Sequence, residues 1–389
     1  MIGQKGFPAV SGGIEKHVQE LSEQLISKNH EVTVFCRGWY SDQIKTDSQV
    51  KRVFVPTLHT KHFDAIIHTF LSIVVAAWNK TDIFHIHGVG PALLAWLPKL
   101  LRPSAKVVVT FHCIDREQKK WGSFARFMLW LGERAACVFP DKTITVSKNL
   151  TEYVKKNYQT DATYIPNGIN IPESKNKIEL LKQFDLEPEK YFLMVSRLVE
   201  HKGQKTLIEA WKTARALRPE IFASLKLVIV GGGSFTDSYV KELHQLACGD
   251  SDIVLTGEQT GETLHELFTN AYAAIHPSLS EGLPIAVLEA MSYSKCVLAS
   301  DIPEHLEVIG DHGLSFTKND SADLAKNLIM MIETPDLTRF VGQSAAKFVQ
   351  ANYSWDEIVI QTDVLYRKLV NENYENPVLS WLTRRKPLL

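Results

Sequence analysis

Two hydrophobic patterns alternate along this chain of 389 residues. Short runs rich in β-branched residues predict buried strands, and between them apolar residues recur at the three- and four-residue spacing of helices. The clearest helix is Gly13–Lys28, whose apolar face is formed by Ile14, Val18, Leu21 and Leu25. This alternation is typical of βαβ units, and it predicts an α/β fold with parallel sheets covered by helices.

The predicted strands form two series, one in each half of the chain. The first series comprises Glu31–Cys36, Val50–Val55, Ile83–His87, Val107–His112, Lys142–Ser147 and Thr163–Pro166. The second series comprises Tyr191–Ser196, Lys226–Val230, Asp252–Thr256, Tyr272–His276, Cys296–Ser300 and Gly313–Thr317. A turn at Ile165–Gly168 and the polar stretch Pro172–Lys177 separate the two series. We therefore predict two doubly wound domains, an N-terminal one of residues 1–170 and a C-terminal one of residues 171–353.

The two ends of the chain depart from this rhythm. Residues 354–389 are predicted to form a C-terminal helix, about Trp355–Leu369, and a tail that cross back to the N-terminal domain. At the other end, only three residues precede the loop that should follow the first, usually central, strand. We expect a truncated first strand, so either the true start lies upstream of Met1 or the domain tolerates a stub.

Composition narrows the class of protein. The five cysteines are scattered singly, which argues against a disulfide framework or a zinc site and favours a reducing cytoplasm. The longest apolar run, Ile66–Trp78, is shorter than the roughly 20 residues that a membrane span requires, and no signal peptide precedes it. We expect a cytoplasmic protein, either free in the cytoplasm or at the inner face of the membrane.

Charge is distributed unevenly between the halves. Residues 1–170 contain 21 Lys and Arg against 14 Asp and Glu, which leaves 22 against 30 for the remainder of the chain. The excess of positive charge in the first half indicates an anionic surface or acceptor there, although an uneven solvated surface explains it equally well. Because the whole chain has a net charge of −1, we expect no nucleic-acid partner.

The most informative segment follows the predicted strand Tyr272–His276. Pro284 suits the first position of a helix, so the amides of Gly282 and Leu283 are predicted to be free to bind an anion with help from the helix dipole. Glu281 stands beside that position, and Glu289 follows eight residues later. A helix rises about 1.5 Å per residue, which places the two carboxylates about 10 Å apart instead of the roughly 5 Å of a retaining glycosidase pair. They are interpreted as two acceptors for one long ligand, or else as ordinary exposed carboxylates.

In this context the chain resembles glycosyltransferase family 4, retaining enzymes with the GT-B fold. The segment from Glu281 to Glu289 matches the E-x7-E motif of that family, and nearly the whole chain shares its pattern. Further matching segments are Gly12-Gly13, Val195-Ser196-Arg197 with Lys202-Gly203, and Pro166-Asn167-Gly168. The resemblance implies two Rossmann-like domains facing a central cleft, a nucleoside-diphosphate sugar as donor, no cofactor and no metal.

The resemblance also implies roles for residues of the C-terminal half, which is expected to hold the donor. Arg197 and Lys202 follow a predicted strand, where ligands bind in open parallel sheets, and two fixed cations stabilise a departing diphosphate. Glu281 is assigned to the sugar hydroxyls and Glu289 to the ribose. Gly257 and Glu258 are assigned to the nucleotide base, through backbone contacts.

In the N-terminal half, the resemblance implies a donor-side role for Gly12, Gly13 and His112. Two glycines at a helix start let the backbone approach a phosphate or sugar, and His112 corresponds to the active-site histidine of the family. Cys113 replaces the glycine that usually follows this histidine. Asp115 is a candidate acceptor-side acid or base, with a helix-start cap as the alternative.

Cations and aromatic residues interleave between Arg116 and Trp130. Such a helix suits an anionic bilayer or a lipid-linked acceptor, and Lys119 and Lys120 are assigned to the acceptor side. An ordinary amphipathic core helix is the alternative interpretation. We expect a glycan or lipid-linked acceptor from cell-envelope polysaccharide synthesis.

Two further motifs are weak. Gly231–Gly233 does not complete a dinucleotide fingerprint, because Thr236 occupies the third glycine position. Asp250-Ser251-Asp252 resembles a metal-binding D-x-D motif, but it precedes a buried strand instead of ending one, so it is interpreted as a turn. A sugar-nucleotide epimerase and a non-catalytic sugar-nucleotide-binding subunit remain the alternatives to a transferase.

Overall fold

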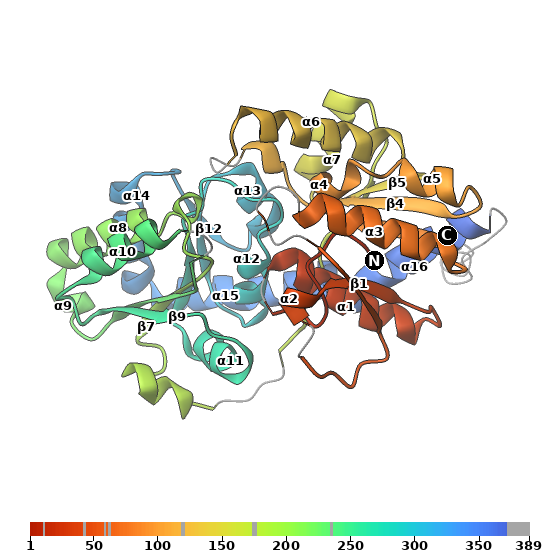
Figure 1. The fold of residues 1–389 in the computed structure, drawn as a ribbon. Helices are drawn as coiled ribbons and strands as arrows, with labels where there is room; N and C mark the ends of the chain where they lie inside the picture. The colour runs from red at the N-terminus through yellow and green to blue at the C-terminus, as the bar shows by residue number, and fades with distance from the viewer. Residues whose placement is uncertain are drawn as a thin grey trace, which may run out of the picture. The chain divides into compact units, whose positions relative to one another are not determined.

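The computed structural model describes residues 1–10, 12–41, 44–57, 60, 64–117, 121–172, 177–233 and 236–371. The chain forms two compact units (Figure 1). Unit 1 contains residues 1–168 together with the segment that begins at Trp355, and unit 2 contains Ile169–Ser354. From the sequence, we predicted the two domain boundaries after residues 170 and 353.

Unit 1 is built on parallel strands in two sheets. One sheet pairs β1 (Thr33–Arg37) with β2 (Lys51–Val55). The other has the order β3-β4-β5-β6, formed by Ile83–His87, Lys106–Phe111, Lys142–Thr145 and Thr163–Tyr164. The strands β1, β3, β4 and β5 are mostly buried, as expected where helices cover a parallel sheet, whereas β2 and β6 at the ends of the strand order are more exposed.

The first residues of the chain lie between these two sheets. The backbone amide of Ile2 donates to the carbonyl of His85 at 2.9 Å, and the amide of His87 donates to the carbonyl of Ile2 at 2.8 Å. On the other side, the amino group of Met1 donates to the carbonyl of Thr33 at 2.7 Å. The stub therefore takes the place of a central strand, and the spatial order of unit 1 is β2, β1, the stub, β3, β4, β5 and β6.

Helices pack on these strands because their apolar stripes face the sheet. The helices of unit 1 are α1 (Gly13–Ser27), α2 (Gly38–Ser41), α3 (Asp64–Trp78), α4 (Val89–Ala92), α5 (Leu97–Leu101), α6 (Ser123–Val138), α7 (Lys148–Tyr158) and α16 (Trp355–Val370), with a 3-10 turn η1 at Asp115–Glu117. The apolar face of α1 predicted from the sequence is largely buried, with Val18, Leu21 and Leu25 in one core cluster. The C-terminal α16 lies beside α1 (Figure 1) and adds Trp355 and Ile358 to the same cluster.

Unit 2 has one parallel sheet of six strands in the order β12-β11-β10-β7-β8-β9. These strands are β7 (Tyr191–Val195), β8 (Lys226–Val230), β9 (Ile253–Gly257), β10 (Ala273–His276), β11 (Val297–Ser300) and β12 (Leu314–Phe316). Counted in chain order within the unit, the sequence of strands is 6-5-4-1-2-3, which is the doubly wound arrangement of dinucleotide-binding domains. The predicted α/β class with parallel sheets is confirmed.

The helices of unit 2 cover both faces of this sheet. They are α8 (Gln204–Leu217), α9 (Pro219–Phe222), α10 (Asp237–Ala247), α11 (Gly261–Asn270), α12 (Ile285–Ser292), α13 (Pro303–Ile309), α14 (Ser321–Glu333) and α15 (Pro335–Asn352), with 3-10 turns η2 (Leu180–Phe184) and η3 (Glu200–Lys202). Trp211 of α8 is fully buried, and its ring lies edge-on to Phe192 and Phe222 at centroid distances of 5.8 and 5.1 Å. Three aromatic rings thereby join β7 to the helices above it.

One predicted helix start is wrong by a residue. Pro284 is the N-cap of α12, and the helix begins at Ile285. The φ of Pro284 is −78°, which suits a helix, but its ψ of 80° does not, so Pro284 closes the preceding turn. Among the helices of the described residues, none combines the length and apolar character that crossing a membrane requires.

Candidate functional site

The loops that follow β7 and β10 meet at the point where the strand order of unit 2 reverses. The amide of Leu279 donates to the carbonyl of His201 at 2.7 Å, which joins the two loops. Gly203 has a φ of 77°, and a Cβ built there would lie 2.2 Å from the carbonyl oxygen of Pro277. Only glycine fits this approach. In doubly wound sheets, this reversal is the position at which ligands bind.

Lys202 and Glu281 form an ion pair at this reversal. The Nζ atom of Lys202 lies 2.5 Å from Oε1 of Glu281, and the two side chains are only 18% and 10% exposed. Burial alone would raise the pKa of Glu281, but the charge of Lys202, and then that of His305, lower it to about 2. The carboxylate therefore stays ionised near neutral pH, where it accepts hydrogen bonds but donates none.

Two buried histidines lie near this pair and were not assigned by the sequence. Burial lowers the pKa of His276 to about 3 and that of His305 to about 4. The Nε2 atoms of both rings are buried without a hydrogen-bond partner among the described residues. Nδ1 of His305 lies 3.1 Å from Oγ of Ser300. Because His276 ends β10, the strand-end rule that singled out Glu281 could also have identified it.

Glycines allow the loops after β8 and β9 to pack closely at the edge of the unit 2 sheet where the loop after β7 also lies. Gly231 has a φ of 151°, and a Cβ there would lie 1.8 Å from the carbonyl oxygen of Ser196. The amide of Gly231 donates to the carbonyl of Gly257 at 2.9 Å. A Cβ on Gly232 would lie 3.3 Å from Oε2 of Glu258. The glycine run that fails as a dinucleotide fingerprint thus brings Gly257 and Glu258 close to the loop after β7.

The remaining predicted residues of unit 2 lie on these same loops. Arg197 is exposed, and its carbonyl accepts a hydrogen bond from Nε2 of Gln204 at 2.8 Å. Gly282 is half-buried and Leu283 is buried in the turn before α12. Glu289 lies one turn into α12 and is half-buried. The structure thus joins Lys202 directly to Glu281.

In unit 1, His112 belongs to a cluster of three buried histidines. His112 follows β4, His87 ends β3 and His17 lies on α1. Nδ1 of His87 lies 3.3 Å from Nε2 of His112, and the rings of His17 and His112 meet edge-on at 5.1 Å. The sequence predicted only His112. His87 also ends a strand and could have been found, but His17 looks like one polar residue on an amphipathic helix.

A second chain of contacts connects this cluster to α16. The rings of His85 and His87 are tilted against each other, with centroids 4.0 Å apart. Nδ1 of His85 lies 2.5 Å from Oη of Tyr366, and Nε2 lies 2.6 Å from Oγ1 of Thr110. Burial lowers the pKa of His17 to about 4, and burial together with the neighbouring rings lowers the pKa values of His85, His87 and His112 well below the usual range. All four imidazoles are therefore neutral near pH 7.

Gly12 and Gly13 open α1, as the sequence predicted. Gly12 has a φ of 103° and is the N-cap of the helix. A Cβ there would lie 2.1 Å from Oε2 of Glu15, whose Oε1 accepts a hydrogen bond from the amide of Lys5 at 3.1 Å. Glycine at position 12 thus permits a tight turn between the stub strand and the helix that carries His17.

The acceptor-side candidates lie after His112. Asp115 begins η1 and its Oδ1 lies 3.3 Å from Sγ of Cys113, while Lys119 and Lys120 lie outside the described residues. Arg116 is fixed by Glu133, a fully buried carboxylate that it contacts at 3.1 Å through both oxygens. Glu133 also accepts hydrogen bonds from the hydroxyls of Tyr153 and Tyr158 at 2.9 and 2.7 Å.

The D-x-D segment pairs with a cation of the protein itself. Nη1 of Arg215 lies 2.8 Å from carboxylate oxygens of both Asp250 and Asp252, and Nη2 lies 2.5 Å from Asp250. The two aspartates hold the end of α8 against the turn before β9. This contact supports the interpretation of the segment as a turn.

Comparison with known proteins gives two matching families that together span most of the chain. The model described as Glycosyltransferase Family 4 matches residues 11–172, and the one described as Glycosyl transferases group 1 matches residues 176–353. An uncharacterised glycosyltransferase of Methanocaldococcus jannaschii is 26% identical, with 92% of this chain and 95% of the relative covered.

Solved structures also resemble the whole chain. Sucrose-phosphate synthase from Thermosynechococcus elongatus aligns with a TM-score of 0.78 at 20% identity, covering 96% of each chain. HepE of Anabaena, in a complex with UDP-glucose, aligns with a TM-score of 0.76 at 18% identity, covering 92% of this chain and 96% of the other. The predicted GT-B fold class, with two Rossmann-like domains, is confirmed by these likenesses.

Proposed function

The chain belongs to glycosyltransferase family 4, and on that premise we propose that it moves a sugar from a nucleoside-diphosphate sugar to an acceptor with retention of the anomeric configuration and without a metal ion. Its membership of the family makes it a glycosyltransferase. The donor, the acceptor, the stereochemistry and the independence from metal are the parts that we propose.

The observation that carries the proposal is the Lys202–Glu281 pair. A half-buried ammonium at the reversal of the unit 2 sheet supplies a fixed positive charge where a diphosphate would bind. The carboxylate 2.5 Å away is held ionised, so it can accept hydrogen bonds from sugar hydroxyls but cannot act as a general acid. A cation for the phosphates and an acceptor for the sugar are thus placed side by side.

The reaction then needs only charge stabilisation and positioning. As the bond between the anomeric carbon and the phosphate oxygen breaks, the electron pair stays on the diphosphate. Lys202, Arg197 and the amides of Gly282 and Leu283 stabilise that charge, which is the task a divalent cation performs elsewhere. The phosphate oxygen takes the proton of the acceptor hydroxyl as the new bond forms on the same face.

The other predicted residues complete the donor site in this proposal. Gly257 and Glu258 contact the nucleotide base and Glu289 accepts from the ribose, whereas a donor-side role of Gly12 and Gly13 rests on the family resemblance. Neutral His112 contributes a hydrogen bond to the sugar. The complex of HepE with UDP-glucose supports a uridine nucleotide as the first donor to test.

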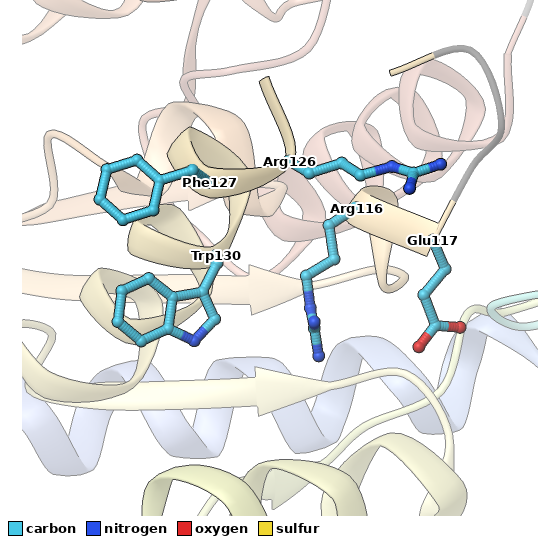
Figure 2. Close-up of a pocket in the computed structure, with 5 residues that line it drawn as sticks. All are labelled: Arg116, Glu117, Arg126, Phe127 and Trp130. Atoms are coloured by element: carbon cyan, nitrogen blue, oxygen red, sulfur yellow. The ribbon is translucent and has the colours of Figure 1, made fainter. Parts of the chain in front are cut away.

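We assign the acceptor, a glycan or a lipid-linked precursor, to unit 1. Three aromatic side chains of α6 are exposed, Phe124 by 78%, Phe127 by 53% and Trp130 by 37%. The rings of Phe127 and Trp130 stack 5.9 Å apart, next to Arg116, Glu117 and Arg126 in a surface pocket (Figure 2). Exposed rings beside guanidinium groups suit the boundary of an anionic bilayer, which supports peripheral membrane contact at this surface.

Transfer assays with radiolabelled UDP-, GDP-, ADP- and dTDP-sugars test the proposal. We expect one nucleotide class to support transfer to extracted glycan or lipid acceptors, equally with and without EDTA. Loss of activity in EDTA that Mg²⁺ or Mn²⁺ restores would contradict the metal-independent mechanism. Conversion of the donor without any acceptor would indicate an epimerase, and donor binding without turnover would indicate a binding subunit.

Paired variants test the site itself. Lys202→Ala and Glu281→Ala should each reduce transfer by about 100-fold or more, because each removes a charge from the reacting centre. Lys205→Ala is the matched control, since Lys205 lies three residues away in an exposed pair with Glu242. Full activity of either test variant in a folded protein would remove the role assigned to that residue.

Sedimentation with vesicles tests the membrane contact. The double variant Phe124→Ser with Phe127→Ser should lose binding to vesicles of anionic phospholipid, whereas vesicles of phosphatidylcholine alone should bind neither protein. Equal sedimentation of the variant and the wild type would refute the contact at α6.

A further inference from the structure

Three buried imidazoles converge in unit 1. His17, His87 and His112 each offer one ring nitrogen, and these three atoms all lie within 4.8 Å of one another. The three rings come from α1, from the end of β3 and from the residue after β4. Each side chain is no more than 6% exposed. Two neighbouring parallel strands and a helix therefore hold the cluster in place.

The cluster does not satisfy its own hydrogen-bonding capacity. A neutral imidazole has one donor and one acceptor nitrogen, and the contact between His87 and His112 uses one nitrogen of each. Nδ1 of His17 is buried without a partner among the described residues. Leaving such a group unpaired costs about 1–3 kcal/mol. A ligand that accepts electron density from nitrogen would remove this cost.

The spacing suits one kind of ligand. A tetrahedral Zn²⁺ ion binds histidine nitrogens at about 2.05 Å, which separates two such nitrogens by about 3.3 Å. Nδ1 of His87 and Nε2 of His112 are 3.3 Å apart. One ring nitrogen of His17 lies within 4.8 Å of a ring nitrogen of each of the other two histidines, so each of these two separations exceeds the 3.3 Å spacing by at most about 1.5 Å.

We propose that His17, His87 and His112 form a binding site for a borderline divalent transition ion such as Zn²⁺, with the fourth coordination position open to water or to a ligand. Three histidine ligands and an open position are a common arrangement for zinc in proteins. The carbonyl and carboxylate ligands that Mg²⁺ and Ca²⁺ prefer are not among these three side chains.

This site is separate from the residues assigned to the diphosphate. Lys202 and Glu281 belong to unit 2, whereas the three histidines belong to unit 1. An ion bound here would occupy the Nε2 atom of His112 that faces His87. Because His112 is the residue proposed to contact the donor sugar, occupation should inhibit transfer, and this consequence alone rests on the proposed function.

Cobalt(II) is the probe, because its visible spectrum reports coordination without any enzymatic assay. Tag-free full-length protein is titrated with Co²⁺ and then with Zn²⁺, and the stoichiometry is checked by equilibrium dialysis. We expect about one ion per chain, with the intense absorption of tetrahedral cobalt that disappears when Zn²⁺ displaces it. A weak octahedral spectrum, or no ion retained after dialysis, would overturn the proposal.

Two variants of His17 distinguish the loss of a metal ligand from the loss of folding. His17→Gln should bind Co²⁺ at least tenfold more weakly, whereas His17→Cys should retain the ion and gain a thiolate-to-cobalt charge-transfer band. His244→Gln is the matched control, since His244 is exposed on α10 of unit 2. Unchanged binding by folded His17→Gln, or equal loss by His244→Gln, would refute the site.

Inhibition of sugar transfer by the bound ion is measured separately from metal binding. Zn²⁺ should reduce transfer by wild-type protein in proportion to occupancy, and EDTA should restore it. Inhibition that follows Co²⁺ binding confirms that the site and the proposed role of His112 are coupled. Binding of one tetrahedral ion without any change in transfer would leave the metal site standing and would contradict the role of His112.

Discussion

Replacing Glu281 by glutamine tests whether the Lys202–Glu281 pair is the charged centre that the geometry indicates. The substitution keeps the size of the side chain and an oxygen that accepts from Lys202, but it removes the negative charge. In the wild-type protein the pKa of Glu281 lies at about 2 instead of 4.5, because the lowering by Lys202 and His305 outweighs the raising by burial. The difference between these two pKa values determines the expected change in the free energy of unfolding.

One pKa unit corresponds to about 1.4 kcal/mol, so the lowered pKa contributes about 3 kcal/mol to the stability of unit 2 at neutral pH. The folded protein binds the proton less tightly than the unfolded chain. The contribution is therefore complete above pH 4.5 and is lost as the pH falls through about 2. Between pH 7 and about pH 3.5, the wild type should lose about 1 kcal/mol of unfolding free energy relative to Glu281→Gln.

Urea unfolding followed by fluorine NMR of 5-fluorotryptophan measures this difference. Trp211 is the only tryptophan between residues 169 and 354, so its signal reports unit 2 separately from unit 1. The exposed pair of Lys205 with Glu242 provides the control, and Glu242→Gln should change stability little at either pH. Equal stabilities of wild type and Glu281→Gln at pH 7, with parallel pH profiles, would refute the assignment of a stabilised buried charge.

Two further predictions concern the scaffold. Gly231→Ala should lower the thermal midpoint of unfolding by about 6–12 °C, because the added Cβ would lie 1.8 Å from the Ser196 carbonyl oxygen. Gly249→Ala is the control, since Gly249 has a φ of 76° but open space around it, and it should lower the midpoint by only about 2–4 °C. Equal shifts would show that backbone conformation alone, and not the approach of the β7 loop, requires glycine at 231. Glu133→Gln should allow Tyr158 to ionise at a lower pH, because burial and then the Glu133 carboxylate raise the pKa of that phenol. Spectrophotometric titration against the wild type checks this, and an unchanged curve would separate Tyr158 from Glu133.

Most strands could be predicted from the sequence because each is a short run buried on both faces. The predicted ranges Ile83–His87 and Lys226–Val230 coincide with β3 and β8, and the others differ by one or two residues at an end. The errors lie at ends because the last pairing is decided by neighbouring strands and not by local pattern. The start of α12 shows the same limit, since the ψ of Pro284 is fixed by the turn and not by the ring.

Strand ends also explain which site residues could be found. Lys202 and Glu281 follow predicted strands and His112 ends one, and the carboxyl ends of strands are where open parallel sheets bind ligands. Their partners depend on strand order. β7 and β10 are neighbours although Lys202 and Glu281 are 79 residues apart, so only the crossover brings the ammonium to the carboxylate. His17 is further from prediction, because a helix must pack in one particular rotation to bury a histidine among strand-end residues.

The stub at the start of the chain links these observations. A doubly wound sheet reverses its strand order beside the first strand, and in unit 1 Met1 and Ile2 occupy that place and hydrogen-bond with both β1 and β3. His87 ends the strand next to the stub, Gly12 lies on the loop that follows the stub, and His17 is carried into the same place by α1. In unit 2 the reversal between β7 and β10 places Lys202 against Glu281. The proposed metal ligands of unit 1 and the Lys202–Glu281 pair of unit 2 therefore lie at the same topological position in their respective sheets.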